Sequence, residues 1–328
     1  MNRTDRRLIH RRAGAVTAGG LDDAGRGGAG NRPPNRVLGV RLLAVLLACA
    51  AEVASLSAQS AAGAPSAAEG TPKGASLEER APVDPVAFFR KHFFPFEPFY
   101  FIAGTESPNA KFQVSLRYQL FTEDGWLAEQ WHGLTNFSVA YTQTSLWDWN
   151  HPSAPFLDTS YKPELNYTWL RVDRGRWADW LRLDLQGGAQ HESNGRGGDE
   201  SRSLNLVYLR PTVTLGFPGR FQATVAPKVF LYVGDLSDNP EIAEYRGYVE
   251  LRTTLGWSGN VQLAATARVG DDFDRGSLQL DLTYPLWKLP ILRSGVFLQA
   301  QYFTGYGESL LLYNERSDGF RAGFALFR

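Results

Sequence analysis

From about residue 98 onward, apolar and polar residues alternate along segments of roughly ten residues each. In residues 112–120, Phe, Val, Leu and Tyr at the even positions alternate with Gln, Ser and Arg at the odd positions. The same two-residue period recurs in residues 181–186, 221–231 and 275–285. A period of two is typical of β-strands with one apolar and one polar face. No stretch in this part of the chain has a clear helical period.

These segments predict about twelve β-strands joined by turns. They lie near residues 98–105, 111–121, 135–145, 163–172, 180–193, 202–215, 220–233, 244–257, 259–269, 275–285, 293–304 and 319–328. An even number of strands brings both ends of an antiparallel barrel to the same side of a membrane.

The choice between a soluble sandwich and a membrane barrel depends on where the charges fall. Arg182, Asp184, Glu250 and Arg252 share rows with polar residues, whereas leucine, valine and aromatic residues fill the opposite rows. A sandwich core does not hold a charged row, but a barrel with a polar lumen does. We therefore predict an all-β, twelve-stranded antiparallel transmembrane β-barrel over residues 96–328, in the bacterial outer membrane.

Connection lengths orient this barrel. Residues 215–220 and 257–259 form short connections, whereas 145–163, 234–243 and 305–318 form longer ones. Short turns face the periplasm in such barrels, so the longer connections and the segment 194–201 should face outward.

The residues before the barrel have a different composition. Residues 1–58 hold an apolar run, Leu42–Ala50, behind Arg36 and Arg41, which predicts a secretory signal; a buried core helix is the alternative. Residues 59–95 are rich in Ala, Ser, Pro and Gly and predict a flexible linker, with ordered structure starting near 88–96.

Charge and cysteine content exclude several classes of protein. The 328 residues carry 34 basic and 34 acidic side chains, so there is no basic surface of the kind that binds nucleic acid. The single cysteine, Cys49, lies in the apolar run and leaves no disulfide framework or thiolate metal site.

Candidate chemistry is concentrated in one predicted hairpin. His191 and Ser193 are two residues apart, so both side chains leave the same face of a strand. If the strand turns back symmetrically around Gly198, Asn205 lies directly opposite His191, within reach of a side-chain hydrogen bond. A nucleophile, a base and an orienting amide then stand in the order of a catalytic triad.

The alternation also predicts the face on which these residues lie. His191 and Ser193 share their row with Leu181, Leu183 and Leu185, and Asn205 shares a row with Val207 and Leu209. All three polar residues should therefore point toward lipid, near the outer leaflet. Such residues are costly there unless they serve a function, and a site on the outer wall would take a lipid as substrate. The alternative is a polar girdle that only meets lipid head groups.

Gln143 is an amide in a row that should meet lipid, together with Phe137, Val139 and Tyr141. Two explanations are open: a β-bulge in the strand, or a row that faces a second copy of the chain.

Taken together, these stretches resemble the outer-membrane phospholipase A family over residues 96–328. The similarity is carried by His191–Arg196 through Ser201–Asn205, with support from 111–116, 141–143, 238–240 and 305–310. The resemblance implies a twelve-stranded barrel that hydrolyses acyl esters of phospholipids and lysophospholipids, requires Ca²⁺ and is active as a homodimer.

The resemblance also implies residue roles. Ser193 matches the nucleophile, His191 the general base, Asn205 the residue that orients the imidazole, and Gly195 the backbone N–H of the oxyanion hole. Gln143 matches an amide buried between subunits.

The implied calcium ligands are the backbone oxygen of Arg196, the hydroxyl of Ser201 and Ser153 of the partner subunit. A second calcium site in the family uses two acids; Asp238 matches one, and Gly198 stands in place of the other, next to Asp199.

The alternative to a phospholipase A1/A2 is a non-catalytic outer-membrane barrel, either a narrow pore or a structural protein. An outer-membrane protease is less consistent with the sequence, because no pair of acids marks a barrel rim.

Overall fold

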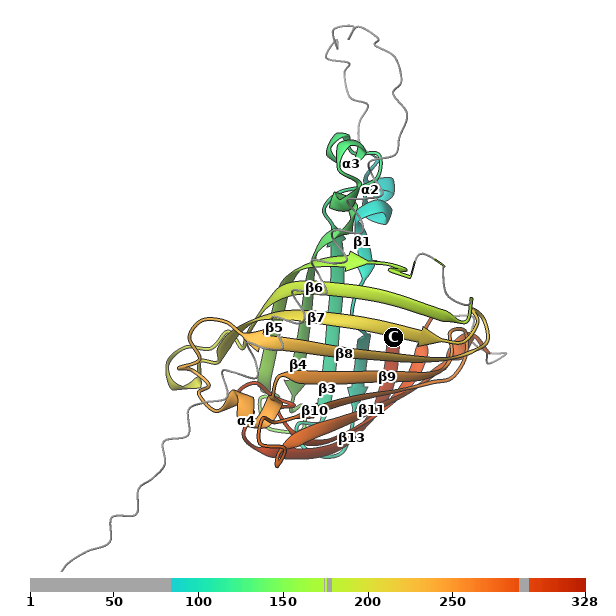
Figure 1. Ribbon diagram of the computed structural model, residues 1–328. Coiled ribbons are helices and arrows are strands. Elements are labelled where there is room, and N and C mark those ends of the chain that lie inside the picture. Colours follow the sequence, from blue (N-terminus) through green and yellow to red (C-terminus); the bar gives the residue numbers. More distant parts are fainter. Residues whose placement is uncertain (1–83, 174, 176–178, 289–294) are drawn as a thin grey trace, which may run out of the picture. The chain divides into compact units, whose positions relative to one another are not determined.

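The computed structural model describes residues 84–173, 175, 179–288 and 295–328, and most of its regular elements are β-strands (Figure 1). The strands are β1 (Phe93–Pro95), β2 (Phe99–Ala103), β3 (Ala110–Gln119), β4 (Phe137–Trp147), β5 (Phe156–Trp169), β6 (Leu181–Ser193), β7 (Ser203–Leu215), β8 (Phe221–Tyr232), β9 (Val249–Trp257), β10 (Gln262–Val269), β11 (Gly276–Pro285), β12 (Phe297–Tyr306) and β13 (Arg316–Phe327).

From β2 onward, each strand pairs antiparallel with the next along the chain, and β13 pairs with β2. This last pairing closes the sheet, so the predicted twelve-stranded barrel is confirmed. The short strand β1 lies on the same edge of β3 as β2 does, with Phe93 opposite Tyr118, and extends the first strand beyond Glu97.

The two faces of the wall differ as the alternation predicted. Leu165 on β5 and Leu251 on β9 point outward and are 48% and 40% exposed, which suits contact with lipid. Glu164 on β5 and Lys228 on β8 instead point into the lumen, and each is 7% exposed. The charged rows therefore line the interior of the barrel.

Short helices lie in the connections and before the first strand: α2 (Pro85–His92), α3 (Trp126–Gln130), α4 (Ile242–Arg246), and the 3₁₀ turns η1 (His132–Asn136), η2 (Gly198–Glu200) and η3 (Leu286–Lys288). Across the described ranges, no helix is long and apolar enough to cross a membrane. Sequence analysis predicted no helix because elements this short span too few turns to show a period.

Helix α2 and β1 occupy the last residues of the range predicted as linker, and the segments 1–58 and 59–83 lie outside the described residues. The helix begins where Asp84 accepts a hydrogen bond from the backbone N–H of Val86 at 2.9 Å. At its other end, a hydrogen bond of 2.7 Å joins His92 Nδ1 to the carbonyl of Gln119 on β3. The described structure thus begins with this helix, inside the range predicted as linker.

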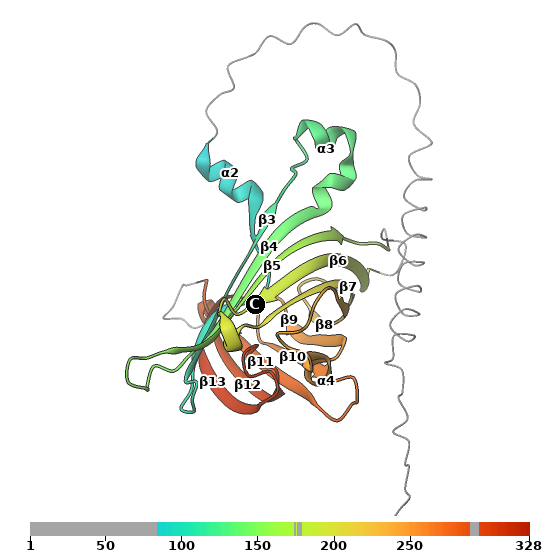
Figure 2. The ribbon, with the colours of Figure 1, turned by 90° about the vertical axis from the view of Figure 1, so that its left-hand side faces the viewer.

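The ends of the barrel follow the expected orientation only in part. The turns 216–220 and 258–261 are short, and they lie at the end opposite the 194–202 connection because the strands alternate in direction. The connection 120–136 lies at the end of these short turns, but it is long and carries α3 and η1 (Figure 2). An ion pair between Lys91 and Asp124 ties this connection to α2.

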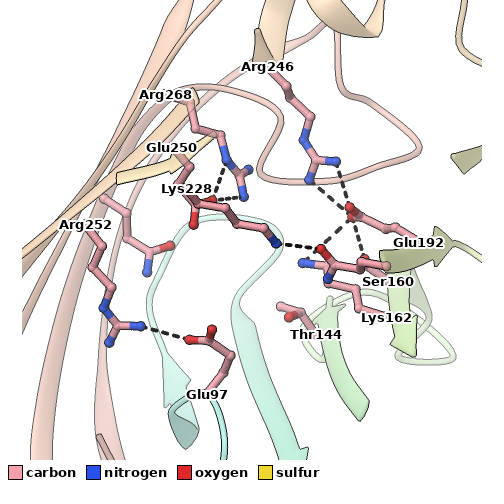
Figure 3. A network of polar contacts seen from close by, with 12 residues as sticks. Glu97, Thr144, Ser160, Lys162, Glu192, Lys228, Arg246, Glu250, Arg252 and Arg268 are labelled. Atoms are coloured by element: carbon pink, nitrogen blue, oxygen red, sulfur yellow. Dashed lines mark hydrogen bonds and ion pairs between the residues drawn. The ribbon is translucent and has the colours of Figure 1, made fainter. Parts of the chain in front are cut away.

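Charged side chains project into the lumen and pair across it. Glu97 accepts hydrogen bonds from Arg210 and Arg252, each at 2.9 Å. Figure 3 shows the bond to Arg252, and it shows Arg268 of β10 paired with Glu250 of the neighbouring β9. A cavity of about 640 Å³ remains between these groups.

At the outer end, an apolar cluster packs α4 and the connection 307–315 into the mouth of the barrel. Its members come from β7, β8, α4 and that connection: Leu204, Leu206, Tyr208, Phe230, Ile242, Leu310 and Tyr313. The cluster joins α4 to β7, one of the two strands of the hairpin that carries the candidate site.

Candidate active site

The β6–β7 hairpin holds His191 and Asn205 opposite each other. The register pairs His191 with Asn205 and Ser193 with Ser203, so the strands turn back symmetrically around residue 198. A hydrogen bond of 2.9 Å joins His191 Nδ1 to Asn205 Oδ1. With Nδ1–H donating to this oxygen, Nε2 keeps its lone pair and can act as a base.

The hairpin directs these side chains out of the barrel. Glu192 and Leu204, which alternate with His191, Ser193 and Asn205 along the strands, line the lumen. Because successive residues of a strand point to opposite faces, His191 and Asn205 lie on the membrane side of the wall.

Ser193 is the last residue of β6 and is half-buried between Tyr161 of β5 and Ser203 of β7. In this described hairpin, Ser193 Oγ donates no hydrogen bond to His191. Catalytic hydrogen bonds are often long in the absence of substrate and shorten when substrate binds.

Gly195 is the second residue of the connection between the two strands and has a φ of +69°, a left-handed conformation that favours glycine. A Cβ at this position would lie 3.0 Å from Cε2 of Tyr161. Among the described residues, no acceptor binds the N–H of Gly195, so this donor is free for a developing oxyanion.

Asn194 fixes the shape of this connection, a role that sequence analysis missed. Its side chain is 5% exposed; Oδ1 accepts from the N–H groups of Arg196 (3.2 Å) and Arg202 (3.0 Å), and Nδ2 donates to the carbonyl of Glu200 (2.8 Å). A buried side-chain amide with all these partners holds the loop in one conformation.

Two of the predicted metal ligands, Ser201 and Asp238, lie together. Ser201 Oγ donates to Asp238 Oδ2 at 2.9 Å, which links the residues assigned to two different calcium sites. In the same loop, hydrogen bonds from the hydroxyl and backbone N–H of Ser237 lower the pKa of Asp235 below its ordinary value, so a second carboxylate there stays ionised.

Arg196 pairs through its guanidinium with Glu200, the residue before Ser201, at 2.5 Å. The guanidinium donates to the carbonyl of Leu157 at 2.5 Å, at the start of β5. No described donor occupies the carbonyl oxygen of Arg196, which leaves it available as a ligand. Within the described ranges, no group of three or more His, Cys, Asp or Glu side chains could hold a metal. The predicted set of a carbonyl, hydroxyls and one carboxylate is the oxygen chemistry that calcium prefers.

Ser153 lies in the connection 148–155 between β4 and β5, at the same end of the barrel as Ser201. It is exposed and has a φ of +72°. Among the described contacts, none joins Ser153 to Arg196, Ser201 or Asp238 of the same subunit.

Gln143 points outward from β4 in an uninterrupted register. The register shift in β4 falls between Leu146 and Trp147, so the bulge considered for Gln143 is wrong. Its amide has partners on its own strand: Tyr141 Oη donates to Oε1 at 3.0 Å, and Nε2 donates to Ser145 Oγ at 3.2 Å.

One row across three strands connects Gln143 to the hairpin. Gln143 pairs with Tyr161, and Tyr161 pairs with Ser193. Tyr161 is the residue of this row that sequence analysis missed, although its position in β5 shares the parity of the outward residues.

Comparison with known proteins agrees with this arrangement. The family model for phospholipase A1 matches residues 100–326. Phospholipase A1 of Escherichia coli (strain K12) is 34% identical over 211 residues, which cover 62% of this chain and 64% of that protein. A putative phospholipase A1 of Neisseria meningitidis serogroup B is 32% identical over 223 residues, covering 65% of this chain and 53% of the relative. The match therefore spans less than two thirds of the length of these relatives.

Solved structures support the fold. Outer membrane phospholipase A from Escherichia coli has a TM-score of 0.57 and 27% identity, covering 71% of this chain and 98% of that one. The outer membrane phospholipase dimer of Salmonella typhi with bound calcium has a TM-score of 0.58 and 27% identity, covering 71% and 91%. The barrel and these relatives make the protein a bacterial outer-membrane protein, as predicted. The chain belongs to the phospholipase A1 family.

Proposed function

We propose that this protein hydrolyses acyl esters of phospholipids and lysophospholipids on the outer wall of its barrel, near the outer leaflet, in a calcium-dependent reaction. The observation that carries the proposal is the 2.9 Å hydrogen bond between His191 and Asn205 on the membrane side, two residues from Ser193. A base oriented in this way beside a serine is the arrangement of a nucleophilic hydrolase.

In the proposed reaction, Ser193 Oγ attacks the acyl carbonyl carbon while His191 Nε2 accepts the hydroxyl proton. Asn205 keeps the imidazole in the correct tautomer, and the N–H of Gly195 stabilises the oxyanion. His191 then gives its proton to the leaving lipid alcohol, which departs from an acyl ester of Ser193. A water molecule, deprotonated by His191, releases the fatty acid and restores the serine.

The surroundings of the site support a lipid substrate. Directly below the hairpin residues, Leu165, Ala189 and Val207 pair across β5, β6 and β7 on the outward face. Leu165 and Val207 are 48% and 39% exposed, so they offer an apolar surface for acyl chains.

We propose that calcium is held by the backbone oxygen of Arg196, the hydroxyl of Ser201 and Ser153 of the partner subunit, with Asp238 adding charge beside Ser201. When bound, the ion supplies positive charge next to the oxyanion formed at Gly195. The outer membrane phospholipase of Salmonella typhi was solved as a dimer with bound calcium, which supports a role for calcium here.

Removing calcium should abolish activity and leave the barrel intact. A chelator withdraws the ion from loop ligands, whereas the strands are held by backbone hydrogen bonds that need no metal. The measurement is fatty-acid release from phospholipid in detergent micelles, with and without EGTA, beside heat-dependent gel migration of the folded barrel. Returning calcium should restore the rate; undiminished release in excess chelator would contradict the calcium assignment.

Dimerisation should depend on Gln143. Between two barrels in lipid, an amide with a partner across the interface contributes to association. Gln143→Ala should lower the fraction of cross-linked dimer, measured with calcium and a non-hydrolysable substrate analogue. Gln113→Ala is the matched control. Gln113 lies on the adjacent strand β3, and its side chain faces the lumen of the barrel rather than a second subunit. Equal cross-linking of Gln143→Ala and wild type would contradict the proposed interface.

A narrow pore is the competing function, and the lumen is unfavourable for it. Ion pairs such as Glu97–Arg210 and Glu192–Arg246 cross the interior between different strands and loops. Single-channel recording in planar bilayers separates the two functions, since a pore conducts ions whether or not Ser193 is replaced.

A further inference from the structure

Glu192 stands between His191 and Ser193 but points in the opposite direction, into the lumen. Its side chain is 5% exposed and lines the interior cavity. A buried carboxylate is costly unless it is paired and hydrogen bonded. The position next to both proposed catalytic residues raises the question of what this carboxylate does.

Four bonds or ion pairs hold the carboxylate (Figure 3). Arg246 of α4 binds it through two nitrogens, at 3.0 Å to Oε2 and 3.2 Å to Oε1. Ser160 Oγ donates to Oε1 at 2.7 Å, and Lys162 Nζ lies 3.8 Å from the same oxygen. Planar, two-point pairing by arginine fixes direction as well as charge.

The backbone of β6 needs this support because its pairing with the neighbouring strand β5 is interrupted there. In the β5–β6 pair, Tyr161 is opposite Ser193 and Glu164 is opposite Gln190, but no paired residues lie between them. Pro163 of β5 falls in this gap, and proline has no N–H to donate. Ser160 and Lys162, from the same strand, bind Glu192 instead, so side-chain contacts replace the missing backbone ladder.

Arg246 is itself immobilised. It is 6% exposed, and α4 is packed into the mouth of the barrel through Ile242, which is fully buried. Gly307 lies against its stem: a Cβ there would be 3.0 Å from Cγ of Arg246. The outer loops thereby hold Glu192 from the side opposite the membrane.

We propose that Glu192 is a positioning residue for His191 and Ser193, with Arg246 as its anchor. The anchored carboxylate fixes the backbone at the centre of the His191–Ser193 segment, and so fixes the directions of both outward side chains. The inference rests on the proposed function, because it assigns Glu192 a role in the same site. It also links α4, an element of the outer loops, to the geometry of catalysis.

The test compares steady-state hydrolysis of a micellar ester by full-length Glu192→Gln and wild type, both in calcium. Glutamine keeps the size and accepts a hydrogen bond but loses the charge that holds Arg246. We expect kcat to fall about 10- to 100-fold, because small misplacements of reacting groups have effects of this size. KM should stay within about twofold, since the substrate meets the unchanged outer wall.

Glu97→Gln is the matched control. Glu97 is also a lumen carboxylate held by two arginines, but it lies on the β1–β2 segment, away from the hairpin. Its kcat should remain within about twofold of wild type. Equal losses in Glu97→Gln and Glu192→Gln would overturn the inference, because they would mean that any lumen carboxylate matters.

Two further variants test the coupling. Arg246→Met should lower kcat as Glu192→Gln does, and the double variant should be no worse than either alone, because both changes break one clamp. Arg246→Lys keeps the positive charge, so its kcat should lie between those of Arg246→Met and wild type. This variant also tests the inference if Glu192→Gln does not fold. Additive losses in the Glu192→Gln/Arg246→Met double variant would overturn the proposed coupling of Glu192 and Arg246. So would a wild-type kcat in both Arg246→Lys and Glu192→Gln.

The outcomes separate this inference from the proposed function. Wild-type kcat in the Glu192 and Arg246 variants, with an inactive Ser193→Ala, overturns only the positioning role. Hydrolysis that survives Ser193→Ala overturns the proposed function, and with it the role of Glu192.

Discussion

Replacing Ser193 by alanine is expected to lower fatty-acid release by roughly three to six orders of magnitude, the range seen when a nucleophile is removed from a triad. The oxygen that would form the acyl ester is gone, while His191 and Asn205 remain hydrogen bonded on the outward face. Release from phospholipid micelles in calcium measures the loss, and heat-dependent gel migration checks that the barrel is folded.

Ser203→Ala is the matched control for this experiment. Ser203 lies directly opposite Ser193 on β7, on the same face, and takes no part in the proposed reaction. Its replacement should leave the rate within a few fold of wild type. If the two variants lost activity equally, the assignment of the nucleophile to Ser193 would be wrong.

Replacing His191 by glutamine is expected to have an effect of similar size. Glutamine can still hydrogen bond to Asn205, but it cannot accept the proton of Ser193 at neutral pH, so the serine stays a weak nucleophile. The same fatty-acid assay measures the loss.

The double variant Ser193→Ala/His191→Gln sharpens this expectation. Residues that act as one unit give non-additive losses, so the double variant should be about as active as either single variant. A further loss of several orders of magnitude in the double variant would mean that His191 and Ser193 contribute independently, which contradicts a shared proton transfer.

Much of the fold and the centre of the site could be predicted because strands carry a simple pattern. The two-residue period separates Leu165 from Glu164 and so separates lipid from lumen. The same period, applied to a symmetric hairpin, places Asn205 opposite His191 and both outside the barrel. Local sequence is sufficient here because the paired residues belong to one hairpin.

Contacts between distant segments could not be predicted in this way. Glu192 and Arg246 are 54 residues apart, and their pairing depends on how α4 enters the barrel mouth. Tyr161 pairs with Ser193 across β5 and β6, and this register depends on the length of the connection between the two strands. Helix α2 was missed because its sequence follows a low-complexity segment. The residues that hold its two ends also lie outside the helix: Asp84 caps its start, and Gln119 of β3 bonds to His92 at its end.

The calcium ligands stay a prediction, although two of them lie together in the structure. Ser201 and Asp238 come from different loops, yet the fold brings them into a hydrogen bond of 2.9 Å. Ser153 lies on the connection 148–155 at the same end of the barrel, and its role toward a second copy of the chain stays a prediction.

The central proposal is that Ser193 is an activated nucleophile on the membrane face, and covalent labelling tests it most directly. Purified protein in detergent and calcium is treated with an alkyl sulfonyl fluoride, which reacts with activated serines, and the modified residue is mapped by mass spectrometry. We expect one sulfonyl group on Ser193 in wild type and none in His191→Gln, with labelling and loss of activity in step. Loss of activity with Ser193 unmodified, or equal labelling of Ser193 in His191→Gln, would contradict the proposal.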